Sequence, residues 1–261
     1  MEEGSIKGTK NPVQSAERIF RVLEVLAETG PIGIMDLSNR LELHKSTVHR
    51  LLLSLICMDY VKQDDTGKYC LTFKIVKLSE KVKAKTDIVS MVHPLIAELA
   101  NKCRETVHFV RREGTEVFYL DKVEPVDPRE SAIRMASQVG VARPMYCSAV
   151  GKAILAEMKD EDIKYIWKNS IIEKKTEHTI TTFEKIMIEI NEIRRNGYAL
   201  DNEENELGVR CIAVCVRDLH GLPNNAFSIS APAVLMTDDR VKQLSVDILK
   251  TKDTIQRILE Q

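Results

Sequence analysis

The sequence predicts an α+β protein of two domains: a small N-terminal domain of helices and a hairpin, and a larger domain that mixes strands with helices. The chain has 261 residues, which is long for one compact domain and sufficient for two. Apolar residues recur at helical spacing from Pro12 onward, and short apolar strands interrupt that pattern only after Glu105. We therefore divide the chain before interpreting any motif.

The composition indicates an ordinary globular chain, with 44% hydrophobic and 30% charged residues. No uncharged apolar stretch reaches the roughly 18 residues of a membrane-spanning helix, and the first residues lack the apolar core of a signal peptide. Six cysteines are scattered without paired spacing, which predicts buried, reduced thiols rather than disulfides or zinc ligands. We expect a cytoplasmic protein without membrane association, metal or cofactor.

Residues 12–72 are predicted to form a winged helix-turn-helix, preceded by a polar, disordered tail at residues 1–11. The first helix begins near Pro12 and ends at Gly30-Pro31, and the short helix IMDLSNRL follows. The third helix is HKSTVHRLLLSLICM, and YVKQDDTGKYCLT then reads as a hairpin that turns at residues 64–67. Three helices followed by a hairpin are typical of a DNA-binding winged helix.

The third helix has the two faces that a DNA-recognition helix needs. One apolar stripe faces the core, and it consists of Val48, Leu51, Leu52 and Leu55. The other faces are polar and carry no acidic residue. In the major groove Arg and Lys reach guanine, while other cations contact phosphates. The candidate DNA-binding residues are Arg40, Lys45, Ser46, Thr47, His49, Arg50, Ser54, Lys62 and Lys68.

The charge distribution gives this interpretation modest support. The formal net charge is −1, so nothing global attracts nucleic acid. Residues 1–85 hold 14 Lys and Arg against 11 Asp and Glu, whereas residues 86–261 hold 24 against 28. This asymmetry suits a basic N-terminal domain and an acidic second one. A helical domain that packs on another protein, with Lys45 and Arg50 merely solvated, remains an alternative.

A basic linker helix is predicted at residues 73–86, and residues 87–261 are predicted to form the second domain. Its first helix starts at Asp87 as N-cap. Another helix is expected to open with a capping box of Thr181 and Glu184 and to stop at Gly197. We expect strands at 105–112, 116–123, 133–139, 209–216 and 226–231, and helices at 149–158, 160–168, 183–196 and from 237. Such interspersed elements predict a curved antiparallel sheet.

Several phrases occur in an order that resembles the IclR-type transcriptional regulators, over about residues 12–259. The phrases are LELHKSTVHRLLLSL, GVARPMYCSAVGKAILA, TITTFEKI, IRRNGYALDNEENELGVRCIAV and AFSISAPAVLMTDDRV. The resemblance implies a winged helix-turn-helix, a linker helix and a GAF-like effector-binding domain, assembled as a dimer or a tetramer of dimers. It also implies a small organic acid or sugar acid as effector. The effector-binding residues it implies are Ser148, Ala149, Val150, Gly151, Asp201, Cys211, Ser228 and Ser230.

The residues themselves agree in part with that assignment. Ser148 stands at a predicted helix start, where free backbone N–H groups favour an anion. Ser228 and Ser230 lie two apart on a strand, so their hydroxyls share one face. Each position also has a plainer interpretation: Ser148 as N-cap, the two serines as exposed strand residues, Asp201 as the cap of a turn and Cys211 as a core residue.

These observations predict a ligand-controlled DNA-binding regulator of a catabolic operon. A dimer would present two recognition helices about 34 Å apart to a pseudo-palindromic operator, and we favour repression over activation. The alternative is a non-enzymatic sensor or interaction module without specific DNA binding. An enzyme that uses Cys147, Cys211 and His108 is disfavoured because no nucleophile motif surrounds either cysteine, and the Cys and His spacing does not fit a closed zinc site.

Overall fold

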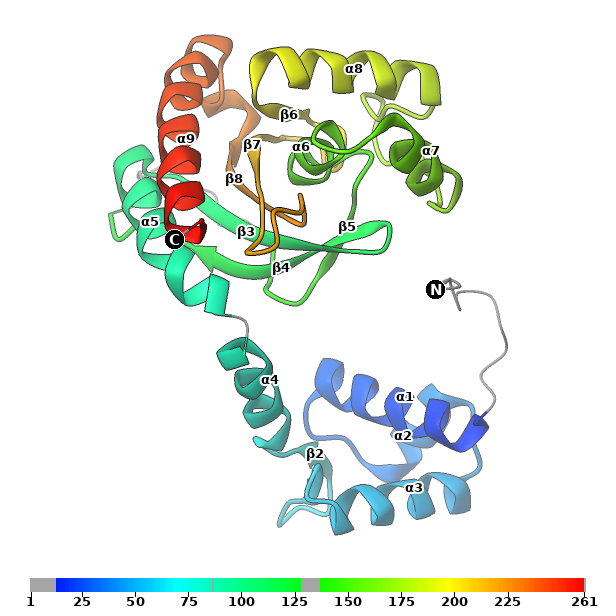
Figure 1. Cartoon of the computed structure of the whole chain (residues 1–261). Coiled ribbons are helices and arrows are strands. Elements are labelled where there is room, and N and C mark those ends of the chain that lie inside the picture. Colours follow the sequence, from blue (N-terminus) through cyan, green and yellow to red (C-terminus); the bar gives the residue numbers. More distant parts are fainter. Residues whose placement is uncertain (1–12, 86, 128–136, 261) are drawn as a thin grey trace. The chain divides into compact units, whose positions relative to one another are not determined.

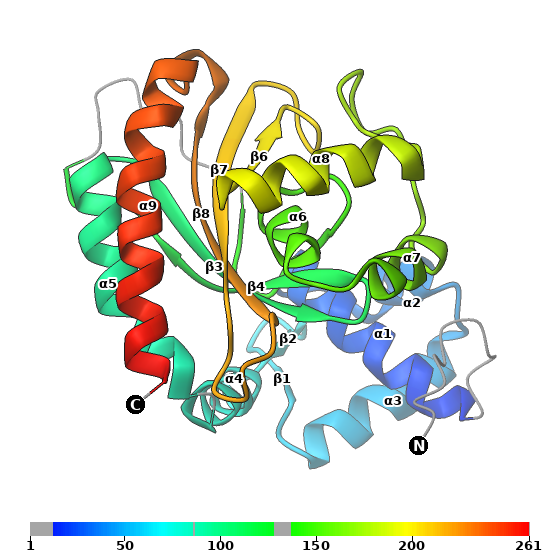
Figure 2. The same ribbon diagram turned by 45° about the horizontal axis from the view of Figure 1, so that its top comes forward.

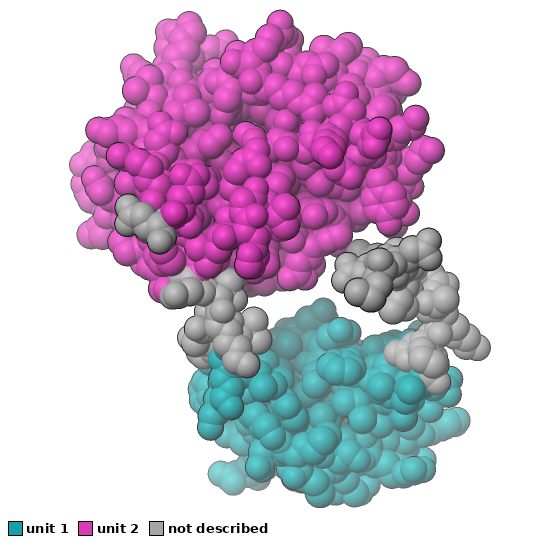
Figure 3. All heavy atoms as spheres, in the orientation of Figure 1, with its two compact units in different colours: residues 1–85 teal, residues 86–261 magenta. Residues whose placement is uncertain are grey.

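The computed structural model describes residues 13–85, 87–127 and 137–260, and the predicted disordered tail lies outside them. The chain divides into two compact units, Met1–Lys85 and Thr86–Gln261 (Figure 3). Each unit has its own hydrophobic core. In the described residues no helix is both long and apolar enough to cross a bilayer.

Unit 1 is a winged helix-turn-helix (Figure 1). Its elements are α1 (Gln14–Thr29), α2 (Ile34–Leu41), α3 (Lys45–Cys57), β1 (Val61–Gln63), β2 (Tyr69–Leu71) and α4 (Lys74–Lys85). Gly30 ends α1 with a positive φ of 67°, which glycine adopts without steric cost. Tyr69 of β2 forms a bridge to Ile32, so the hairpin is tied to the connection between α1 and α2.

The hairpin turn of unit 1 is held by one carboxylate. Asp64 Oδ1 accepts hydrogen bonds from the backbone N–H groups of Thr66 and Lys68, at 2.9 and 3.0 Å. The Thr66 hydroxyl also donates to this oxygen, at 2.7 Å. That bond is the largest cause that lowers the pKa of Asp64, and the two backbone bonds act in the same direction, because all three stabilise the ionised form. Lys62 of β1 and Lys68, the residue before β2, stay exposed on either side of the turn.

Unit 2 is built on one six-stranded antiparallel sheet of order β5-β4-β3-β8-β7-β6 (Figure 2). The strands are β3 (Thr106–Glu113), β4 (Glu116–Val123), β5 (Ala142–Pro144), β6 (Ala199–Asn202), β7 (Val209–Val216) and β8 (Asn225–Pro232). The helices are α5 (Asp87–Cys103), α6 (Ala149–Ala156), α7 (Asp160–Lys168), α8 (Phe183–Asn196) and α9 (Asp238–Leu259), with a 3-10 turn at Ala233–Leu235. The predicted α+β fold with a winged helix-turn-helix and an antiparallel sheet is confirmed.

Helices cover both faces of the sheet. One core places α5 and α9 against Phe109, Ile212 and Phe227, and the other places α6, α7 and α8 against Val117 and Ala213. Because successive strand residues point to opposite faces, the residues that alternate with the first set belong to the α6 side. A bulge in β3 between Phe109 and Val110 shifts that alternation.

Three local predictions were wrong or lie partly outside the described residues. Residues 133–136 of the expected strand at 133–139 are not described, residues 137–139 form no strand, and β5 pairs with β4 at Ala142–Pro144 instead. The expected capping box does not form, because the N-cap of α8 is Thr182 and it makes no side-chain cap bond. Cys57 is exposed, and Cys70 and Cys211 are half-buried rather than buried.

Candidate ligand pocket and nucleic-acid interface

Helix α3 presents a polar face opposite its buried stripe. Val48 and Leu52 have no exposed surface and Leu55 retains 1%, so the stripe forms the contact with α1 and α2. In the first two turns the exposed side chains are Lys45, Ser46, His49 and Arg50, and that of Thr47 is half-buried. The predicted donors therefore remain accessible at the N-terminal half of the helix.

The cations of this surface are not neutralised by the protein. Among the described residues, no ion pair engages Lys45 or Arg50, and Arg40 at the end of α2 is exposed as well. Ser54 lies one turn after Arg50, and its hydroxyl donates to the Arg50 carbonyl at 3.2 Å. Free cations at the start of an exposed helix and on a hairpin match the phosphate and base contacts of a winged helix.

Unit 2 contains a pocket between the α6 side of the sheet and the first turn of α6. The volume in which the centre of a water molecule fits is about 40 Å³. Its walls come from the six strands of the sheet, the start of α6, the segment before β5 and the connection between β6 and β7. The residues are His108, Tyr119, Ser137, Arg143, Ser148, Ala149, Val150, Asp201, Asn205, Glu206, Val209, Cys211, Ser228 and Ser230.

The first turn of α6 is fixed by Ser148. Its hydroxyl donates to the Pro144 carbonyl at 2.7 Å and accepts from the N–H of Gly151 at 3.2 Å. Within the described residues, the N–H groups of Ala149 and Val150 have no protein acceptor. Free N–H groups at a helix start carry partial positive charge, so this wall of the pocket favours an anion.

Gly151 supports this turn without lining the pocket. A Cβ at Gly151 would lie 2.3 Å from the Cα of Met145 and 2.5 Å from its carbonyl oxygen. The absence of a side chain therefore lets α6 pack directly on the backbone that precedes it.

Asp201 is a buried carboxylate at the pocket wall. Its Oδ1 accepts the backbone N–H groups of Glu204 at 2.8 Å and Asn205 at 3.4 Å, so it caps the turn after β6. Burial raises the pKa of Asp201 to about 7, and the neighbouring charge of Glu204 acts in the same direction. Near neutral pH this group can therefore either accept or donate a hydrogen bond to a ligand.

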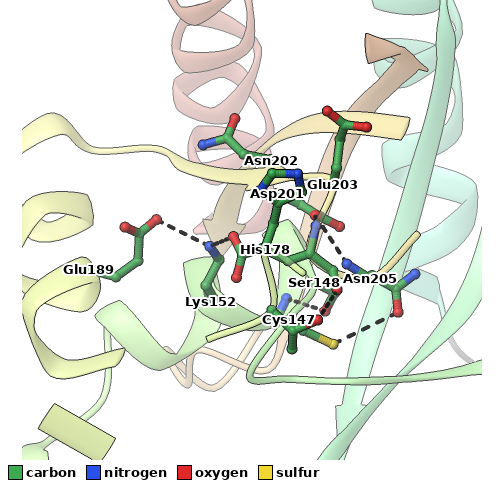
Figure 4. Close-up of polar contacts among 12 residues, drawn as sticks. Cys147, Ser148, Lys152, His178, Glu189, Asp201, Asn202, Glu203 and Asn205 are labelled. Carbon is green, nitrogen blue, oxygen red and sulfur yellow. Dashed lines mark hydrogen bonds and ion pairs between the residues drawn. The ribbon is translucent and has the colours of Figure 1, made fainter. Parts of the chain in front are cut away.

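Lys152, one residue after Gly151 in α6, forms a buried ion pair (Figure 4). Lys152 of α6 has no exposed surface, and its Nζ lies 2.5 Å from Oε1 of Glu204 and 3.1 Å from Oε1 of Glu189 on α8. The two carboxylates raise the pKa of Lys152 against the opposing effect of burial. The pair joins α6 to the loop whose N–H groups hold Asp201.

Seven pocket residues were missed by the sequence analysis: His108, Tyr119, Ser137, Arg143, Asn205, Glu206 and Val209. The ring of His108 on β3 contacts that of Tyr119 on β4, with centroids 4.9 Å apart and planes tilted by 45°, and the guanidinium of Arg143 lies 6.0 Å from the Tyr119 ring. Burial is the main cause that lowers the pKa of His108 to about 3, with help from the charges of Lys122 and Arg143. For His108 the sequence did contain a signal: it alternates with the core residues Val107 and Phe109 on the strand, so its side chain points to the opposite face of the sheet.

Comparison with known proteins identifies the two units. The model described as "Bacterial transcriptional regulator IclR C-terminal" matches residues 80–257, and "IclR helix-turn-helix domain" matches residues 15–65. Over 244 residues the chain is 32% identical to the HTH-type transcriptional regulator KdgR of Escherichia coli K12, covering 93% of this chain and 91% of that protein. This chain belongs to the IclR family of transcriptional regulators.

Other similarities agree with this assignment. The regulator is 35% identical over 236 residues to the DNA-binding transcriptional repressor YiaJ of Escherichia coli K12, covering 88% and 80% of the two chains. The crystal structure of the Thermotoga maritima IclR aligns with a TM-score of 0.82 at 27% identity, over 95% of this chain and 99% of that one. Like other members of the IclR family, the chain is a DNA-binding regulator that responds to a small-molecule effector, and it is not an enzyme.

The effector-site residues implied by the resemblance come together in this IclR-family fold. Ser148, Ala149, Val150, Asp201, Cys211, Ser228 and Ser230 all line the pocket, whereas Gly151 packs behind it. The thiols have none of the activation that an enzyme would need: burial raises the pKa of Cys147 to about 12 and raises that of Cys211 as well. No group of metal-ligating side chains occurs among the described residues.

Proposed function

We propose that this regulator is a repressor of a catabolic operon that is controlled by a small organic acid or sugar acid bound in unit 2. The observation that carries the proposal is the pocket, where Arg143 and the free N–H groups of Ala149 and Val150 stand beside hydroxyl groups and Asp201. A cation and a helix start attract a carboxylate, and the serines supply hydrogen bonds for the rest of a polar acid.

For the DNA side, we propose that a homodimer, or a tetramer built from two dimers, reads a pseudo-palindromic operator. Residues 12–72 of each chain would contact DNA, residues 73–86 would connect, and residues 87–261 would bind the effector. Two α3 helices about 34 Å apart fit successive major grooves. The exposed, unpaired Arg50 supports direct contact with DNA.

The DNA proposal is tested by fluorescence anisotropy with a duplex from the region upstream of the regulator's own gene. Arg50→Ala should weaken binding about 5- to 150-fold, the loss of one base or phosphate contact. Arg195→Ala is the matched control, because Arg195 is an exposed arginine of α8 in unit 2, and it should bind as the native protein does. Failure of the native protein to bind any part of that region above random duplex would favour an interaction module without specific DNA binding.

The effector proposal is tested by thermal unfolding in the presence of small acids. A ligand at 100 times its Kd stabilises the native state by about 2.7 kcal/mol. For a unit of this size that corresponds to a rise in Tm of about 5–10 °C. Arg143→Ala should remove the rise for acids. An acid that raises Tm but leaves operator affinity unchanged would contradict control of DNA binding by this pocket.

A further inference from the structure

The ring of His108 lies between two serine hydroxyls in the pocket. Nε2 is 2.6 Å from Oγ of Ser137, and Nδ1 is 3.3 Å from Oγ of Ser230. His108 is 2% exposed and Ser230 is 4% exposed, and Ser230 belongs to β8, which pairs with β3. The three side chains thus form one hydrogen-bonded chain that lines the cavity.

The imidazole of this chain is neutral at physiological pH. Burial lowers the pKa of His108 to about 3, and the positive charges of Lys122 and Arg143 act in the same direction. In a neutral imidazole one ring nitrogen donates and the other accepts. One serine must therefore donate to the ring, while the other accepts from it.

This constraint determines what the two serines can offer a ligand. The serine that donates to His108 has only lone pairs left, so it can accept from a ligand. The serine that accepts from His108 keeps its hydrogen, so it can donate to a ligand. Either tautomer of the ring leaves one serine able to donate and the other able to accept, and Ser230 has the Cys211 thiol as a further hydrogen-bond partner.

One donor beside one acceptor complements a hydroxyl group, which also donates once and accepts. A carboxylate or a ketone only accepts, so it would leave the serine lone pairs unmatched in a buried site. The positive charge lies elsewhere in the pocket, at Arg143, and Tyr119 contacts both that guanidinium and the His108 ring. The two regions suit two different groups of one molecule.

We propose that His108 is a specificity-determining residue, which makes the pocket select small acids that carry a hydroxyl group over the same acids without it. The inference rests on the proposed function, because it assumes that the pocket binds a small acid. It adds to that function the chemical feature that distinguishes the effector from other acids.

The test compares matched acids that differ only in hydroxyl groups: glycerate with propionate, D-gluconate with hexanoate, and 4-hydroxybenzoate with benzoate. Binding to the full-length protein is measured by isothermal titration calorimetry. At least one hydroxylated acid should bind about 5- to 150-fold more tightly than its partner, the effect of one satisfied buried hydrogen bond. His108→Leu should reduce that ratio to near one, because Ser137 and Ser230 lose the ring that orients their hydroxyls.

His108→Gln is the second variant, because its amide retains a donor and an acceptor, and it should keep part of the ratio. It also keeps the test decisive if the leucine variant does not fold. Equal affinities within every pair, or a ratio that survives in His108→Leu, would overturn the role of His108 while leaving the proposed function intact. Absence of binding by all six acids would contradict the proposed function and this inference together.

Discussion

Replacing Gly151 by alanine tests whether the pocket depends on the close approach between α6 and Met145. The new Cβ would lie 2.3, 2.5 and 2.7 Å from three backbone atoms of Met145. Since backbone cannot rotate away as a side chain does, the first turn of α6 must move by about 1 Å. Overpacking of this kind costs about 3 kcal/mol, which for a unit of this size lowers Tm by about 6–12 °C.

The assay is thermal unfolding followed by tryptophan fluorescence, because the single tryptophan, Trp167, lies in α7 and reports on unit 2 alone. Trp167 packs against Tyr146 and Phe183, so its signal should change when the α6 side of the sheet opens. The control is Gly114→Ala, whose Cβ meets nothing within 4 Å but whose φ is +63°. It should cost about 1 kcal/mol from the left-handed backbone alone. Equal Tm values for the two variants would refute the steric argument.

Two further substitutions probe buried charges of unit 2. Asp201→Asn should raise the free energy of unfolding at pH 8 by up to about 4 kcal/mol and change it little at pH 4. The pKa of Asp201 is about 7 in the folded protein against an ordinary value of 3.8, so the native protein loses stability as the pH rises from 3.8 to about 7. A difference between variant and native protein that does not depend on pH in urea unfolding would contradict this. Lys152→Met should destabilise unit 2 by about 3–5 kcal/mol, because Glu204 would lose its ion-pair partner and its Oε2 already has no partner among the described residues. Lys164→Met, at an exposed position of α7, is the control. Equal urea midpoints for the two variants would exclude a stabilising ion pair.

Unit 1 was predictable because its helices are amphipathic and well punctuated. The stripe of Val48, Leu52 and Leu55 identifies the inner face of α3 directly from its spacing. Gly30 marks the end of α1, and Asp64 begins the hairpin turn. Local sequence patterns are sufficient to predict the fold of such a small domain, since each element buries one face against its neighbours.

The pocket was predictable only where a family motif covers it. His108 and Tyr119 lie inside apolar strands, and a period of two cannot say which face meets α6 and which meets α5. The bulge after Phe109 changes the alternation within β3 itself. Thr181 was misassigned for a similar reason, because it precedes another threonine and the helix begins one residue later. These features depend on packing between residues that are far apart in the sequence, so a short stretch of sequence cannot predict them.

Lys152 shows most clearly what a local pattern cannot reveal. In the sequence it is one lysine in a short helix, yet it is fully buried because α6 lies between the sheet and α8. The same helix carries the pocket N–H groups on its first turn and the close contact of Gly151 with Met145. Its ammonium also holds Glu204, whose N–H binds Asp201. We therefore expect substitutions in α6 to change both the stability of unit 2 and its affinity for the proposed effector. A variant of Arg143, which is half-buried and lies outside α6, separates the two effects better.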